Sequence, residues 1–318
     1  DAGNLILNAT EQLSALGTVN TAAGSGGSGA GVEISAADLT IVGPGAAPGS
    51  SGVQLQADVL NGWNASKLLI GGQRSADGST IAVTADSVAL SSGAQLHADE
   101  VVLVAQSSVT VGAGSEIATP SAASTGTPPK LSAVDVTLTG GAAPAAMLAV
   151  SDLEDLVVDR RVGALGVGGQ VNLDPQSSVL TRGALNVDAP GGAQLAGTLG
   201  GAGAQWSLGG SRLVVGAAGP SGSIGLDSEV LSRLQDASAL RLTGTESIDF
   251  ATAATIGSPA APLDALEIVT GKVTNSGGQS VSLYATDISL DGLASAVGPA
   301  AAAGKGNLRL SGQEIDVS

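Results

Sequence analysis

The sequence predicts an all-β fold, a right-handed parallel β-helix (a solenoid) in which short strands stack coil upon coil. The first observation is an apolar sequence segment that occurs twice, in residues 81–96 and again in residues 101–117. Each copy alternates apolar with polar or small residues, which is typical of strands with one buried face. A unit of this size cannot bury its own apolar face, so its repetition predicts units that stack on one another.

The second observation is the near absence of aromatic side chains, since 43% of the residues are hydrophobic but only 1% are aromatic. An ordinary globular core draws much of its buried area from aromatic rings. This chain must instead build its core from Val, Leu, Ile and Ala, which suits a narrow interior with the same small volume in every layer. The 48 glycines favour turns rather than disorder, because the mean hydropathy is +0.33.

The two copies can be aligned residue by residue, with one residue inserted in the second copy. We expect aligned apolar residues to be neighbours in the stack. The aligned pairs include Ile81 with Val101, Val88 with Val109 and Leu96 with Ile117.

Further units of the same kind follow along the chain. They occupy residues 5–21, 32–43, 53–72, 134–141, 153–173 and 184–217, and a tighter phrase recurs from Leu240, Val281 and Leu308. One coil per roughly 21 residues would give about 15 coils and a rod on the order of 70 Å long, because neighbouring strands lie about 4.8 Å apart. The chain begins and ends within this pattern, so we expect a single repeat domain over residues 1–318 that belongs to a longer secreted protein.

Three segments rich in Gly, Pro, Ser or Thr are expected to leave the stack as loops: residues 21–31, 43–52 and 119–130. The strand pattern resumes after each of them, so they are not read as domain boundaries. Residues 227–237 break the β pattern, since Val230, Leu231 and Leu234 share one face of a helix. We expect a short helix there, with Asp227 or Ser228 as its N-cap.

Charge and composition exclude several classes of partner. The net charge is −16, with 12 basic and 28 acidic residues, which argues against nucleic acid and against anionic lipid. No apolar stretch approaches the roughly 20 residues of a membrane helix, so no membrane insertion is expected. The chain has no Cys, which excludes disulfides and thiolate metal sites, and nothing in the sequence predicts a cofactor.

Residues 66–105 and 230–250 resemble the filamentous haemagglutinin family of bacterial two-partner-secretion exoproteins, in the phrases "SKLLIGGQRSADGSTIAVTADSVALSSGAQLHADEVVLVA" and "VLSRLQDASALRLTGTESIDF". The resemblance implies a secreted or cell-surface fibre with a long β-helical shaft. It also implies export through an outer-membrane secretion partner and a use in adhesion, aggregation or matrix assembly. The chain resembles shaft only, so no adhesive residues carry over from the family.

Two groups of polar residues are candidates for a metal site or a catalytic site. His97 lies near Asp99 and Glu100, a combination that could bind a metal, but a solvated turn is the preferred interpretation and no metal site is predicted. The densest acidic cluster is Asp152, Glu154, Asp155 and Asp159 beside Arg160 and Arg161. In a polysaccharide lyase or hydrolase, such carboxylates would have to converge on one groove. Self-neutralised surface charge is the preferred interpretation, and no catalytic residues are predicted.

Trp63 and Trp206 are the two candidate contact residues. A Trp exposed on a flat β face could stack on a sugar ring, which would make the chain a carbohydrate-binding module. The competing interpretation is a Trp that covers an end of the stack or a loop.

The preferred function is therefore structural: a rigid shaft segment of an extracellular bacterial fibre or adhesin, not an enzyme. The ends of a β-helix expose unpaired strand edges, so copies are expected to associate end to end. A host or cell-surface glycan is the other expected partner. The alternative functions are a β-helical polysaccharide lyase or hydrolase and a carbohydrate-binding module.

Overall fold

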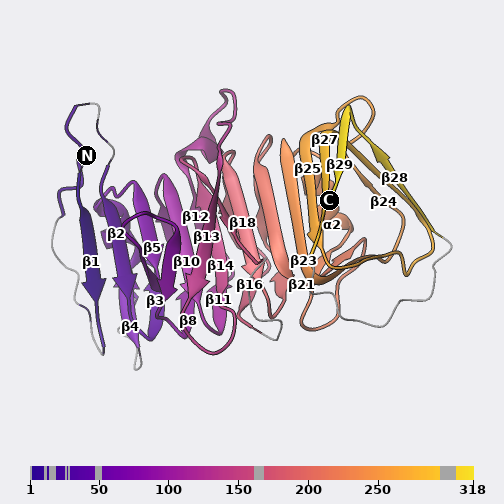
Figure 1. The fold of residues 1–318 in the computed structure, drawn as a ribbon. Helices are drawn as coiled ribbons and strands as arrows, with labels where there is room; N and C mark the ends of the chain where they lie inside the picture. The colour runs from indigo at the N-terminus through magenta and orange to yellow at the C-terminus, as the bar shows by residue number, and fades with distance from the viewer. Residues whose placement is uncertain are drawn as a thin grey trace.

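The computed structural model describes residues 2–10, 13, 19–25, 27, 29–46, 52–160, 168–293 and 306–318. These residues form a mostly β protein with large parallel sheets, as the sequence predicts. Strands lie side by side along one axis, and the chain advances along that axis from its N-terminal to its C-terminal region (Figure 1). Three ladders of paired strands, defined below, organise this arrangement.

The first ladder contains eleven of the described strands. In spatial order they are β1 (Asn4–Asn8), β2 (Gly31–Ser35), β5 (Lys67–Ile70), β10 (Glu100–Ala105), β14 (Ala146–Ser151), β18 (Ala184–Ala189), β21 (Gln205–Val215), β23 (Ala239–Phe250), β25 (Leu263–Thr270), β27 (Ser280–Gly292) and β29 (Glu314–Val317). At about 4.8 Å per step this ladder is about 48 Å long. It is shorter than the expected rod because loops and an added outer layer of strands take up much of the chain.

The second ladder lies beside the first. Its members are β4 (Val53–Gln56), β3 (Asp38–Val42), β8 (Ser87–Leu90), β11 (Ser108–Val111), β16 (Gln170–Leu173), β19 (Ala193–Leu195), β22 (Ile224–Leu226), the second halves of β21 and β23, and β26 (Val273–Thr274). All of these pairings are parallel.

The third ladder has two parts separated by a helix. The first part is β9 (Gln95–His97), β12 (Glu116–Ala118), β17 (Ser178–Leu180) and β20 (Thr198–Leu199); the second is β24 (Ala254–Ile256), the first half of β27 and β28 (Asn307–Ser311). Between them in sequence lies α2 (Ser228–Leu234). Arg233 donates to the carbonyl of Gly197, just before β20, and Gln235 donates to the carbonyl of Thr255 in β24, so the helix joins the two parts.

The predicted helix at residues 227–237 is confirmed as α2. The Asp227 carboxylate accepts hydrogen bonds from the backbone N–H groups of Glu229 and Val230, which makes it the N-cap. Val230 and Leu234 are buried in the main core. A second helix, α1 (Ala57–Gly62), was not expected, because residues 53–72 read as one more strand unit. A 3₁₀ turn, η1 (Pro120–Ala123), begins the predicted loop 119–130.

The alignment of the repeated phrases is right for its second half and wrong for its first. Val88 pairs with Val109 in the second ladder, and Leu96 pairs with Ile117 in the third. Val101, however, pairs with Leu68, and Ile81 lies in a different sheet. The alignment of the three repeated segments near the C-terminus is also right only in part. The copies from Val281 and Leu308 stack in register, whereas the copy from Leu240 pairs with β21 and β25.

A small outer sheet covers part of the first ladder. Its strands, in order, are β15 (Asp155–Val158), β13 (Ala133–Thr139), β7 (Thr80–Val83) and β6 (Gly72–Arg74). They enclose a second core on the outer face of β5, β10 and β14. This second core contains Leu69, Ile81, Val83, Val102, Val104, Val136, Ala145, Met147, Ala149, Leu156 and Val158. As a result, β10 and β14 are buried on both faces.

Strand β14 also runs against the direction of its neighbours. It pairs antiparallel with both β10 and β18, whereas the rest of the first ladder is parallel. The chain leaves the stack after β12, forms β13 in the outer sheet, and returns through β14 before it enters β15. The fold therefore departs from the expected all-parallel stack at this one strand of the ladder and at the antiparallel β6–β7 pair.

The second core predicts a large effect for its one methionine. Replacing Met147 with Ala should lower the free energy of unfolding by about 2–5 kcal/mol, because a fully buried side chain leaves a cavity. Urea unfolding measures this. Thr110→Ala, on the half-exposed face of β11, is the control and should change the stability by about 0.5 kcal/mol or less. Equal, small effects for both variants would contradict the second core.

Candidate functional site

The two tryptophans predicted as surface contacts are buried instead. Trp63 is 4% exposed and Trp206 is 3% exposed, and both pack in the main core. Neither ring offers a flat face to a sugar, so the prediction of an aromatic contact surface is wrong. The physical reason is hydrophobic burial, because each ring removes a large apolar area from water when it packs in the core.

Each tryptophan has a local packing partner. The hydroxyl of Thr21 donates to the carbonyl of Trp63, directly after α1, which ties the segment before β2 to this helix. The ring of Trp206 lies under Gly200, where a Cβ atom would come within 2.3 Å of the ring carbon Cζ2. A side chain at residue 200 would therefore displace the ring. The indole Nε1 of Trp206 is buried, and none of the described residues accepts a hydrogen bond from it.

The acidic cluster of residues 152–159 does not converge on one groove. The carboxylate of Asp152 accepts hydrogen bonds from Thr119 and Thr181 and from the backbone N–H of Ser121, which anchors the loop that starts at residue 119. Asp155 accepts from Asn186 of β18. The convergence that a lyase or hydrolase would need is therefore absent from these carboxylates.

Arg160 forms a buried ion pair with Asp188, and its guanidinium also donates to the carbonyl of Ala145. Burial raises the pKa of Asp188, while the adjacent Arg160 acts in the opposite direction. Arg161, the other basic member of the cluster, lies outside the described residues.

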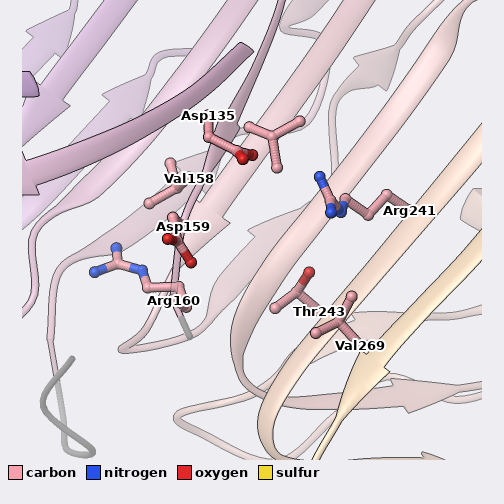
Figure 2. Close-up of a pocket in the computed structure, with 8 residues that line it drawn as sticks. Asp135, Val158, Asp159, Arg160, Arg241, Thr243 and Val269 are labelled. Atoms are coloured by element: carbon pink, nitrogen blue, oxygen red, sulfur yellow. The ribbon is translucent and has the colours of Figure 1, made fainter. Parts of the chain in front are cut away.

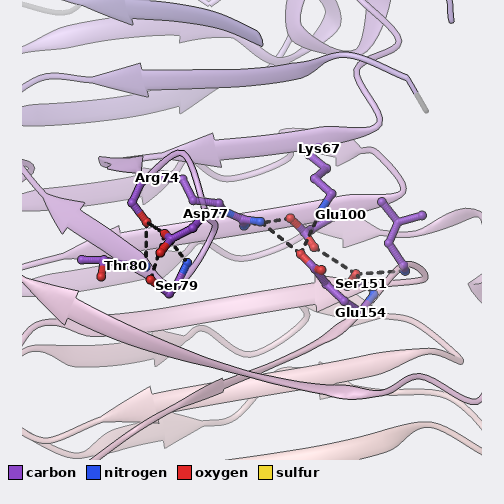
Figure 3. A network of polar contacts seen from close by, with 10 residues as sticks. Lys67, Arg74, Asp77, Ser79, Thr80, Glu100, Ser151 and Glu154 are labelled. Carbon is purple, nitrogen blue, oxygen red and sulfur yellow. Dashed lines mark hydrogen bonds and ion pairs between the residues drawn. The ribbon is translucent and has the colours of Figure 1, made fainter. Parts of the chain in front are cut away.

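The most extensive ionic cluster joins the outer sheet to the first ladder (Figure 3). Glu100, fully buried at the start of β10, accepts from the Arg74 guanidinium at 2.9 Å and from the Ser151 hydroxyl at 3.2 Å. Arg74 also pairs with Glu154 at 3.1 Å, and Lys67 approaches the same carboxylate at 2.7 Å. The cluster thus links β5, β6, β10 and the turn before β15.

Burial and charge act against each other in this cluster. Burial raises the pKa of Glu100, and the neighbouring Arg74 and Lys67 only partly offset it. Burial also acts to raise the pKa of Glu154, but there the hydrogen bond from Lys67 and the charges of Lys67 and Arg74 prevail and lower it. The cluster therefore pairs two cations with two carboxylates.

A small pocket lies between the outer sheet and the C-terminal half of the first ladder (Figure 2). Its volume is about 20 Å³, which is room for one water molecule and not for a sugar. Asp135, Asp159 and Arg160 line one side, and Arg241 and Thr243 line the other. Arg241 is paired with Glu267 of β25 at 2.5 Å.

His97 does not assemble a metal site. Its side chain is exposed on β9, whereas Glu100 lies under the outer sheet and binds Arg74, and Asp99 accepts a hydrogen bond from Ser66. Within the described ranges, no group of three or more His, Asp or Glu side chains is placed to hold a metal ion.

The C-terminal end of the structure leaves core positions uncovered. Ile288 of β27 is 2% exposed, but Ile315, its ladder neighbour in β29, is 45% exposed. Val281 is 1% exposed, but Leu308, its neighbour in β28, is 40% exposed. Val317, at the next inward position of β29, is 69% exposed. These side chains continue the apolar ladders, and no strand of the described residues lies over them.

The N-terminal end is covered on one side only. At the third ladder, the Asn61 side chain of α1 donates to the carbonyl of Gln95 and accepts from the N–H of His97, both at 2.9 Å. The amide thus replaces a neighbouring strand at the edge of β9. At the first ladder, β2 is the partner of β1 among the described strands, and Leu5 and Leu7 are partly buried against the core.

Sequence reasoning missed the Arg74–Glu100 pair and the amide cap of Asn61. The sequence does indicate that Glu100 has a buried partner, because an acidic residue at the start of the apolar run "EVVLVA" cannot be buried without one. No sequence signal identifies Asn61. The inward positions Leu308 and Ile315 were recognised as part of a repeat, but not as uncovered.

No family model, curated protein or solved structure matches this chain. In the part of the chain that the structure describes, the helices are too short to span a bilayer.

The ionic cluster predicts a pH-dependent loss of stability. Arg74→Met leaves Glu100 buried without its guanidinium, which should cost about 3–5 kcal/mol at neutral pH. A carboxyl group with a raised pKa stabilises the fold when protonated and loses that contribution as pH rises. The cost should therefore shrink as pH falls toward the unfolded Glu pKa of about 4.3.

Lys130→Met removes the exposed pair with Asp264 and is the matched control, with little expected effect on stability at any pH. Urea unfolding between about pH 4 and 7 measures both variants. A cost for Arg74→Met that stays constant over this range would contradict the account.

Proposed function

We propose that this chain is a structural segment of an extracellular bacterial fibre or adhesin, and that its three ladders wind as a right-handed parallel β-helix. The supporting observation is the order in which the chain visits the ladders. It passes from the second to the third to the first through β8, β9 and β10, and again through β16, β17 and β18. A chain that repeats this circuit advances by one strand spacing per turn.

The core supports a load-transmitting rather than a catalytic role. One cluster of buried aliphatic side chains extends from Val32 in β2 to Ile288 in β27. Continuous hydrogen-bonded ladders over such a core make a stiff element, because each strand is held by both neighbours. The polar clusters described above bind elements to one another instead of facing a groove.

A stiff element of this kind acts by holding other surfaces at a distance from the cell. The proposal includes secretion to the bacterial surface through an outer-membrane partner, which the family resemblance implies. It also includes a glycan or host surface as the target of the assembled fibre. The proposal also includes end-to-end association of copies, through the apolar positions of β28 and β29 that are exposed among the described residues.

The proposal predicts that association depends on the uncovered core positions. The double variant Ile315→Lys, Val317→Lys should remain folded but become monomeric, because two charges replace the apolar end of the first ladder. Sedimentation velocity over a range of protein concentrations measures this, with circular dichroism as the folding check.

Thr110→Lys, on the half-exposed outer face of the second ladder, adds a charge away from the ends and should associate like the unmodified chain. A chain that is monomeric before any substitution, or a double variant that still associates, would refute end-to-end assembly.

A further inference from the structure

The outer sheet is joined to the stack by side chains and not by strand pairing. Among the described residues, its four strands, β6, β7, β13 and β15, pair with one another and with no strand of the ladders. The strands beneath it, β5, β10 and β14, have their own neighbours in the first ladder. Removing the outer sheet would therefore leave the strand pairings of the first ladder intact.

The outer sheet also covers a core of its own. Val102 in β10 and Met147 in β14 belong to the second core, beneath the outer sheet. Val101 and Leu148, each adjacent to one of them in the chain, face the opposite way and belong to the main core. Because the two cores are buried by different partners, the second can be exposed while the first stays packed.

Two arginines tie the outer sheet to the first ladder at its two edge strands. Arg74 is the last residue of β6 and binds the buried Glu100 of β10 at 2.9 Å (Figure 3). Arg160 lies two residues after the end of β15, and its guanidinium pairs with the buried Asp188 of β18. Each edge of the outer sheet is therefore held by an ion pair whose carboxylate belongs to the ladder below.

Gly71 connects the β6–β7 hairpin to the stack. It follows β5 directly, its φ is 100°, and its carbonyl accepts hydrogen bonds from the N–H groups of Thr84 and Ala85 where the chain returns after β7. The hairpin therefore leaves and re-enters the stack at one point. A Cβ atom at residue 71 would lie 1.9 Å from the carbonyl oxygen of Val104, so this connection requires glycine.

We propose that the outer sheet opens as a unit while the stack beneath it remains folded, and that the ion pairs of Arg74 and Arg160 keep it closed. Opening exposes the apolar outward face of β10 and β14, a surface that the closed protein does not present. This movable layer goes beyond the structural role proposed above and does not depend on it, because it concerns a single copy of the chain.

Thiol labelling tests the opening, because the native chain has no Cys. Val101→Cys and Val102→Cys are a matched pair, since they make the same substitution at adjacent, fully buried residues on opposite faces of β10. Each variant is treated with an excess of the thiol reagent DTNB at several urea concentrations below the unfolding transition. Met147→Cys and Leu148→Cys repeat the comparison on β14. Circular dichroism checks that every variant is folded.

The cysteine beneath the outer sheet should react at least about tenfold faster than its neighbour in the main core, because local opening costs less free energy than global unfolding. Its labelling rate should also rise less steeply with urea, because opening one layer exposes less surface than unfolding the chain. Equal rates with the same urea dependence in both pairs would show that the two cores are exposed only together, which would overturn the inference.

Substitution of the arginines tests what keeps the outer sheet closed. In the Val102→Cys chain, Arg74→Met or Arg160→Met should raise the labelling rate at least about tenfold, because each leaves a carboxylate buried without its cation in the closed state. Arg212→Met is the control: it removes an exposed pair with Glu246 and should change the rate about threefold or less. Unchanged labelling in both arginine variants would show that these ion pairs do not hold the outer sheet.

Discussion

The structure depends on the stacking of inward-facing aliphatic side chains at matched positions of successive parallel strands. Val88, Val109 and Val171 illustrate it: they are direct ladder neighbours in β8, β11 and β16, and each is buried. The core is built mainly from Val, Leu, Ile and Ala, and the few aromatic side chains of the sequence that it contains are Trp63, Trp206 and Phe250. By the same principle, Leu308 and Ile315 are exposed where no strand of the described residues lies over β28 and β29.

The polar clusters follow from a second layer added to this stack. The outer face of the first ladder is apolar at Val102 and Met147, so it requires a cover, and the outer sheet supplies one. Charged side chains lie around that cover: Arg74 and Glu100 on one side, Arg160 and Asp188 on another. Carboxylates held under a sheet need cations and hydroxyl groups close by, because burial otherwise disfavours their charge. Two members of the acidic cluster of residues 152–159 have such partners, since Glu154 binds Lys67 and Arg74 and Asp155 accepts from Asn186.

The alternation of apolar and polar residues predicted the strands and much of the stacking. A strand that buries one face has an apolar side chain at every second residue, so the pattern is visible in the sequence. It could not distinguish Ile81, in the outer sheet, from Val101, in the main ladder, since both strands bury apolar side chains with the same period. The helix α1 was missed because "ADVLNG" is too short for a helical period to emerge. The tryptophans were misplaced because a single large apolar residue has no periodicity to assign its face. Asp152 accepts hydrogen bonds from Thr119, Ser121 and Thr181, which are far from it in the sequence. The sequence pattern therefore could not predict these contacts.

The measurement that tests the central claim most directly is a cryo-electron microscopy map of the assembled protein. The account predicts filaments in which strands repeat every 4.8 Å or so along the axis. Along the filament, the chain should visit the second, third and first ladders in that order in each right-handed turn. Compact particles in which the first ladder is closed at both ends by other parts of the same chain would contradict the account.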